Sequence, residues 1–354
     1  QGGAVDELRV AMWRARLEQE AAEPAILRKR LEATRKAAES YWKWVAWGGK
    51  RAIAQRLLDV AEARQAQVRA SVDEGELAEI DAVDNQRLIV DRQAKLAIIE
   101  RGLQQSAILL SLYWRDADGQ PLVPGAGSLP ATFPAAHDPA MTLLADDEEL
   151  AVKRRPELRE LELDIEALAM EGELFDNQLL PRLDLEVEAS QDTGDAVNTP
   201  DDKGDFELNA ALRFQLPLQR RKPKGKQLAN VAKRAKLDYE LRFLRDVVVS
   251  EVRDAASALR QTWVRLDQAE QNVELARLLE EAERVRLEAG ESDLFRVNVR
   301  EKQSAQAASA LVDVLAEHFL ALVSYRAVLG IPYDEVLAGQ AVGGGDLPSE
   351  SGPP

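Results

Sequence analysis

The sequence contains no cysteine among its 354 residues. Within these residues, this excludes disulfide bonds, thiol catalysis and cysteine-based metal sites. Histidine is almost as scarce, because only His137 and His318 occur, far apart in the sequence. We therefore expect no metal centre and no cofactor. No Ser/His/Asp arrangement, phosphate-binding glycine loop or paired acid and base stands out, so the sequence predicts no catalysis.

Aromatic residues are also few, at 5% of the chain against 45% hydrophobic residues. This balance favours long helices that pack through alanine and leucine. The formal net charge of −16 argues against a nucleic-acid surface, since phosphate binding requires clustered basic residues. One short basic run exists, which we interpret as a turn facing solvent or lipid headgroups: Arg220, Arg221, Lys222, Lys224 and Lys226.

Long apolar runs are missing as well. No run approaches the roughly 18 residues that a membrane-spanning helix requires, and no signal peptide is recognisable. The chain begins Gln-Gly-Gly without a methionine. We therefore expect a processed or truncated product.

A repeat is the most informative feature that the sequence does contain. A helix–glycine–helix unit around Gly75 (residues 69–86) returns around Gly290 (residues 286–303). Flanking apolar residues recur every three or four positions, which is typical of amphipathic helices in a bundle. The chain is therefore predicted to consist of two similar halves.

The pattern along the chain predicts a mainly α fold with a small β part. We expect a first helix from about residue 5 to 70, interrupted mildly at Pro24 and at Gly48–Gly49. The aromatic residues beside these glycines, Tyr41, Trp42, Trp44 and Trp47, are interpreted as packing residues rather than ligand contacts. The expected segments are a long helical hairpin in 1–114 with its tip near 75, a Pro/Gly-rich connector in 115–146, a helix in 147–180, a β-hairpin in 181–218, a second long helical hairpin in 219–330 with its tip near 290, and a disordered tail in 331–354.

Two segments with a period of two form the β part. The apolar set is Leu183, Leu185 and Val187 with Phe206, Leu208, Leu212 and Phe214. The polar set is Asp184, Glu186 and Glu188 with Glu207, Asn209 and Arg213. Such alternation fits strands of a transmembrane β-barrel, with the apolar set facing lipid and the polar set facing a pore. The same alternation also fits a soluble two-layer sheet packed on the helices.

Several segments in the right order resemble the TolC-type outer-membrane efflux protein family. They are residues 154–190, FQLPLQ (214–219), AGESDL (289–294), SYRAVLG (324–330), SYWKWVAWGG (40–49) and LSLYWRDADGQPLVP (110–124). The resemblance implies a homotrimer in the outer membrane of a Gram-negative bacterium. Each protomer would give four strands to a shared twelve-stranded barrel and long helices to an α-barrel that extends into the periplasm. The partners it implies are outer-membrane lipid, a periplasmic adaptor (membrane fusion protein) and, through the adaptor, an inner-membrane transporter.

The resemblance also assigns roles at the two turns. It implies that the tip docks the adaptor through Gly75, Glu76, Glu79, Gly290, Glu291, Ser292, Asp293 and Leu294, although helix capping and solvation alone would explain the same residues. Acidic rings commonly narrow the tip in this family, and Asp81 and Asp84 lie suitably on one helix face. The second repeat departs from that pattern with Arg296 and Val299. Arg296 is hypothesised to pair with Asp81 or Asp84 on a neighbouring helix and hold the tip shut.

The chain departs from the family in its first repeat, which lacks the opening helix and both strands. Three such protomers would supply only six strands, fewer than the eight of the smallest common barrels. We expect the natural chain to extend upstream with a signal peptide; the weaker alternative is a natural variant that closes no such barrel.

The predicted function is a passive exit channel of a tripartite efflux or type I secretion system. The alternative is a soluble coiled-coil scaffold or periplasmic adaptor. The cargo is not predicted.

Overall fold

The computed structural model describes residues 5–139, 144–191, 206–216 and 218–332. The predicted disordered tail lies almost entirely outside these residues, as do part of the connector and most of the loop between the strands. The chain divides into two compact units. The first comprises Gln1–Arg28 with Pro156–Val247, and the second comprises Lys29–Arg155 with Val248–Pro354.

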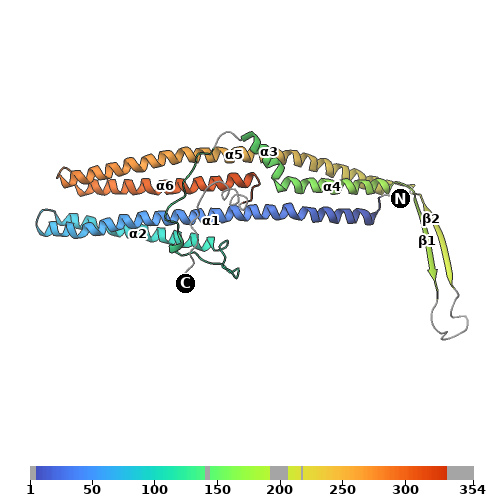
Figure 1. Cartoon of the computed structure of the whole chain (residues 1–354), viewed down its shortest axis with the longest axis horizontal. Coiled ribbons are helices and arrows are strands. Elements are labelled where there is room, and N and C mark those ends of the chain that lie inside the picture. The colour runs from blue at the N-terminus through green and yellow to red at the C-terminus, as the bar shows by residue number, and fades with distance from the viewer. Residues whose placement is uncertain (1–4, 140–143, 192–205, 217, 333–354) are drawn as a thin grey trace, which may run out of the picture. The chain divides into compact units, whose positions relative to one another are not determined.

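The first unit joins three helical segments to a two-stranded sheet (Figure 1). Its elements are the start of α1 (Glu7–Asp73), α4 (Pro156–Asn177), β1 (Arg182–Ser190), β2 (Glu207–Gln215) and the start of α5 (Arg221–Glu288). Arg28 of α1 pairs with Glu160 of α4 at 3.0 Å. The buried Asn230 of α5 donates to the carbonyl oxygen of Leu168 in α4 at 2.9 Å. These bonds place α4 between the two long helices.

The second unit contains the remainder of α1 and α5 with α2 (Glu79–Leu110), the 3₁₀ turn η1 (Ala126–Ser128), α3 (Leu144–Arg154) and α6 (Leu294–Val328). Figure 1 shows α2 beside α1, where Leu58, Ala61 and Ile89 form a small core. A larger core surrounds the fully buried Trp44 and includes Leu103 and Leu110 of α2. Trp44 is therefore a packing residue, and the partly buried Tyr41, Trp42 and Trp47 pack against the same core.

Helix α1 runs through both sites at which an interruption was expected. Its 67 residues include Pro24, Gly48 and Gly49 without a break. The two glycines instead permit close approach. A Cβ atom at Gly48 would lie 2.6 Å from the side chain of Leu129, and one at Gly49 would lie 3.2 Å from Val312.

The helix predicted over residues 147–180 is wrong, because two helices occupy this region. α3 ends at Arg154 and α4 begins at Pro156. Proline has no N–H to donate and restricts the backbone of the residue before it, so Arg155 leaves the helical conformation. The Arg155 guanidinium is held by Glu251 at 2.8 Å.

Helix α6 is apolar enough and long enough to cross a membrane by composition, contrary to the expectation of no such run. Its packing is that of a bundle helix. Asp313 pairs with Lys50 of α1 at 2.6 Å, and Glu317 pairs with Arg265 of α5 at 2.5 Å. These ion pairs attach α6 to helices of the same unit, and its buried apolar residues include Val297, Val314 and Phe319.

Candidate functional site

The two predicted turns have the same backbone conformation. Gly75 and Gly290 have φ angles of 80° and 74°, a left-handed conformation that glycine adopts without steric cost. The N–H of Glu76 donates to the Ser71 carbonyl at 2.9 Å, and the N–H of Glu291 donates to the Arg286 carbonyl at 2.8 Å. Each glycine N–H donates to the carbonyl three residues earlier. Both turns are therefore glycine-terminated helix ends of the Schellman type.

The helices that follow the turns begin differently. Asp293 precedes α6, and its carboxylate accepts a hydrogen bond from the Arg296 N–H at 2.8 Å. Ala78 precedes α2 and has no side-chain oxygen, so Asp81 reaches back and accepts from the Ala78 N–H at 3.1 Å. Both arrangements satisfy N–H groups that have no partner inside the helix.

The predicted gate residues thus have local partners within the chain. The Arg296 guanidinium lies 3.6 Å from Asp293 of its own helix. Asp84 lies 3.9 Å from Arg87, and Asp81 caps α2. The hypothesised pairing of Arg296 with an aspartate on a neighbouring helix remains a prediction.

The second turn covers a buried carboxylate that the first turn lacks. Glu283 is 6% exposed and accepts a hydrogen bond from the Ser292 hydroxyl at 2.5 Å. Arg286 and Arg300 lie 3.6 and 3.9 Å from its oxygens. When the two turn glycines are aligned, the position of Glu283 corresponds to Val68, which is also buried. The sequence analysis missed this difference.

A buried ionic cluster joins three helices below the turns. Glu301 of α6 is 2% exposed and pairs with Arg64 of α1 and with Arg92 of α2, the latter at 2.9 Å. Arg64 also donates to Asn298 at 2.6 Å, and Arg92 donates to the Leu57 carbonyl. Burial of these charges is tolerable because each one has an opposite partner and further hydrogen bonds. The cluster links the first helical hairpin to the second.

The strand hairpin separates its polar and apolar residues as predicted. The strands pair antiparallel, with Leu183 opposite Phe214 and Leu185 opposite Leu212 on one face. Asp184 lies opposite Arg213 on the other face, and Arg213 pairs with Glu186 at 3.6 Å. Leu185 and Leu212 are 70% and 69% exposed. Among the described residues, nothing covers the apolar face of this two-stranded sheet.

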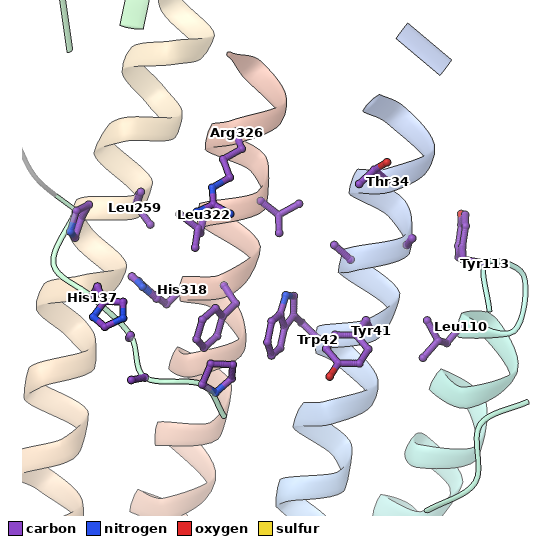
Figure 2. Close-up of a pocket in the computed structure, with 18 of the residues that line it drawn as sticks. Thr34, Tyr41, Trp42, Leu110, Tyr113, His137, Leu259, His318, Leu322 and Arg326 are labelled. Atoms are coloured by element: carbon purple, nitrogen blue, oxygen red, sulfur yellow. The ribbon is translucent and has the colours of Figure 1, made fainter. Parts of the chain in front are cut away.

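An aromatic pocket of about 1030 Å³ lies within the second unit, between α1, α6 and the connector. Trp42, Phe319 and Phe133 form a three-ring cluster, in which the ring centroid of Trp42 lies 4.4 Å from that of Phe319 and 5.8 Å from that of Phe133. Figure 2 shows His137 and His318 on the same side of this pocket, although sequence separation suggested no common site. In the described ranges, no group of three or more His, Cys, Asp or Glu residues is placed to hold a metal ion.

Burial changes the acid–base behaviour of two groups in the second unit. Desolvation lowers the pKa of His318, whose Nδ1 lies 3.3 Å from the hydroxyl of Thr262. Desolvation, followed by the hydrogen bond that the Tyr325 hydroxyl donates to Asp147, raises the pKa of Tyr325. In both cases burial favours the uncharged form of the side chain.

No protein-family model matches the chain, and a search of curated proteins finds no match either. Solved structures do match. A membrane protein from Pseudomonas aeruginosa superposes with a TM-score of 0.77 at 17% identity, covering 89% of this chain and 71% of that one. The open-state MtrE outer-membrane channel of Neisseria gonorrhoeae superposes with a TM-score of 0.76 at 16% identity. The match covers 92% of this chain and 72% of the MtrE chain.

The outer-membrane protein VceC from Vibrio cholerae gives a TM-score of 0.74 at 17% identity, covering 92% of this chain and 76% of that one. The fold of this chain is that of the TolC-type outer-membrane channels.

Proposed function

We propose that this chain is a subunit of a passive outer-membrane channel for efflux or secretion. The observation that carries the proposal is the strand hairpin, which exposes one wholly apolar face and keeps its charges on the other. A soluble protein buries such a face against other elements. In a membrane the apolar face contacts lipid while the polar face lines an aqueous pore.

Closure of the channel requires further strands. A two-stranded sheet leaves unpaired backbone groups on both edges, and lipid cannot satisfy them. In this proposal, the hairpin joins strands of neighbouring copies in a homotrimer. The chain spans 71% of the Pseudomonas aeruginosa structure and 72% of MtrE.

The helices would form the part of the channel that extends into the periplasm. α5 has 68 residues, and a helix of that size is about 100 Å long. The channel would provide no energy; transport would follow from an inner-membrane transporter that loads it. The acidic majority on the polar strand face, including Asp184, Glu186 and Glu188, would give the pore a mild preference for cations.

The glycine turns would dock a periplasmic adaptor. Gly75, Glu76 and Glu291 are exposed at the turns, together with Phe295, which is 75% exposed just after the start of α6. An exposed aromatic ring beside acidic residues offers both apolar contact and charge complementarity to a helical partner. Purified adaptors of the source organism should bind the chain in a biosensor assay, and Phe295→Glu should weaken that binding while Leu275→Glu, farther from the turn, should not.

The first experiment is reconstitution of the purified full chain into planar lipid bilayers, with its oligomeric state measured by native mass spectrometry. Trimers that conduct ions in discrete steps would support the proposal. Soluble particles without conductance would contradict it and favour the coiled-coil scaffold.

A further inference from the structure

The segment that follows β2 has a charge balance opposite to that of the whole chain. From residue 216 to residue 237 there is no Asp or Glu, whereas the net charge of the protein is −16. The same stretch contains eight basic residues: Arg220, Arg221, Lys222, Lys224, Lys226, Lys233, Arg234 and Lys236. Such local segregation of charge is unexpected for a solvated helix face, where both signs normally alternate.

The structure places most of these side chains on the exposed surface of one element. Helix α5 begins at Arg221, and Arg221, Lys222, Lys224 and Lys226 all fall within its first two turns. Each of these four residues is exposed. Six helical residues rise by about 8 Å, comparable to the Debye length of about 8 Å at physiological ionic strength. The four charges therefore act on a nearby surface together.

Another side of the same turns is attached to α4. Gln227 donates to Asp176 at 2.5 Å, and Asn230 donates to the Leu168 carbonyl at 2.9 Å. The ammonium group of Lys226 lies 5.3 Å from the ring centre of Phe175. These contacts attach the first turns of α5 to α4. The basic residues therefore belong to a helix segment with a fixed position in this unit.

Apolar side chains continue from the strand into this basic segment. Phe214 at the end of β2 is 65% exposed, Leu216 is 46% exposed and Leu218 is 86% exposed. Exposed apolar residues directly before a basic cluster match the order of a membrane boundary, in which hydrocarbon gives way to headgroups. Arg221 can also present two parallel N–H donors to a phosphate group.

From this juxtaposition, we propose that the start of α5 is a binding surface for anionic phospholipid headgroups of the membrane leaflet next to the end of β2. The proposal rests on the membrane location of the strand hairpin. The basic cluster sets how deeply the hairpin sits, because its charges remain at the headgroup level while Phe214 and Leu216 enter the hydrocarbon. A nucleic acid is disfavoured by the overall charge of −16.

The test compares lipid binding by the full chain in detergent, measured by native mass spectrometry. The probes are phosphatidylglycerol and, as the uncharged reference, phosphatidylcholine. We expect the chain to prefer phosphatidylglycerol. The test variant carries four substitutions: Arg221→Gln, Lys222→Gln, Lys224→Gln and Lys226→Gln. Its ratio of phosphatidylglycerol to phosphatidylcholine binding should fall by about tenfold or more, because one basic residue near an anionic surface contributes roughly fivefold.

A matched control removes four other exposed charges. Arg69→Gln, Arg87→Gln, Arg101→Gln and Arg277→Gln cause the same change in net charge at sites remote in sequence from β2. This variant should keep the preference, and circular dichroism should show equal helix content in both variants.

Two results would overturn the proposal: an unchanged preference in the first variant, or an equal loss of preference in the control. Bilayer conductance measured on the same preparations separates this outcome from failure of the proposed function. Channels without lipid preference would remove only the lipid surface, whereas absence of channels would remove the membrane location itself.

Discussion

The two helical turns have the same backbone and different polar interiors. Gly75 and Gly290 adopt the same left-handed conformation, and equivalent hydrogen bonds end the helices before them. Beneath the second turn, however, the carboxylate of Glu283 replaces the apolar Val68 of the first. The comparison indicates that the fold requires the glycine and the helix end, whereas the buried carboxylate next to the turn belongs to the second hairpin only.

The buried ionic cluster extends the same difference. Glu301 aligns with Gln86 of the first hairpin, which is exposed, yet Glu301 is 2% exposed and holds two arginines. Both arginines, Arg64 and Arg92, come from the first hairpin. The second hairpin thus supplies the anion and the first supplies the cations, so the two halves of the duplicated chain are complementary rather than equivalent.

The largest expected effect comes from removing the shared anion. Glu301→Gln would leave Arg92 buried without a charged partner, and we expect the free energy of unfolding to fall by about 3–5 kcal/mol. Guanidinium unfolding followed by circular dichroism measures this change. The matched control is Glu317→Gln, which breaks the exposed pair with Arg265 and should cost less than about 1 kcal/mol. Equal losses in the two variants would show that the cluster has no special role.

Exchanging the aligned buried residues should have unequal effects. Val68→Glu buries a carboxyl group in an apolar site and should destabilise the protein by about 1–3 kcal/mol. Glu283→Val should change stability by about 1 kcal/mol at most, because Arg286 and Arg300 are 50% and 36% exposed and remain hydrated. Thermal unfolding of the two variants measures which one loses more stability. A larger loss of stability for Glu283→Val than for Val68→Glu would contradict the comparison.

A smaller effect is expected at the helix starts that follow the turns. Asp293→Ala removes the side-chain acceptor before α6 and should cost about 1 kcal/mol. Ala78→Ser supplies an acceptor that α2 lacks and should stabilise the first hairpin by a similar or smaller amount, about 0.5–1 kcal/mol. Unfolding temperatures of both variants against the unchanged chain test whether the two starts differ as the structure shows.

The smallest effect is a dependence on pH. Burial lowers the folded-state pKa of His318, so below the unfolded value of about 6.5 the unfolded chain binds a proton that the folded chain resists. Stability should therefore fall as the pH drops through that value and recover above it. His318→Gln should reduce this dependence, whereas His137→Gln, at an exposed residue, should leave it intact. Identical pH profiles for the two variants would contradict the assignment.

The parts of this structure that depend on local sequence could be predicted. Gly75 and Gly290 marked both turns, and strict alternation marked β1 and β2 with the correct faces. Pro156 disfavours a continuous helix, but the apolar residues that follow it recur with helical periodicity, and the sequence was interpreted as one helix. In each case the signal lies within a few residues of the feature.

The ionic cluster could not be predicted in this way. The chain has 46 basic and 62 acidic residues, and nothing in the sequence separates Glu301 from the carboxylates that remain in solvent. Its burial depends on the packing of α6 against α1 and α2, which brings together residues far apart in the chain. The common pocket of His137 and His318 has the same origin.

In the channel that we propose, the strand hairpin lines an aqueous pore with one face and contacts lipid with the other. Because the chain has no cysteine, single cysteines can be introduced without a competing thiol. Asp184→Cys and Leu185→Cys place the thiol on opposite faces of β1. In bilayer recordings with a charged, water-soluble thiol reagent, we expect conductance to fall for Asp184→Cys and to remain unchanged for Leu185→Cys. A response at Leu185→Cys with none at Asp184→Cys would contradict the channel assignment.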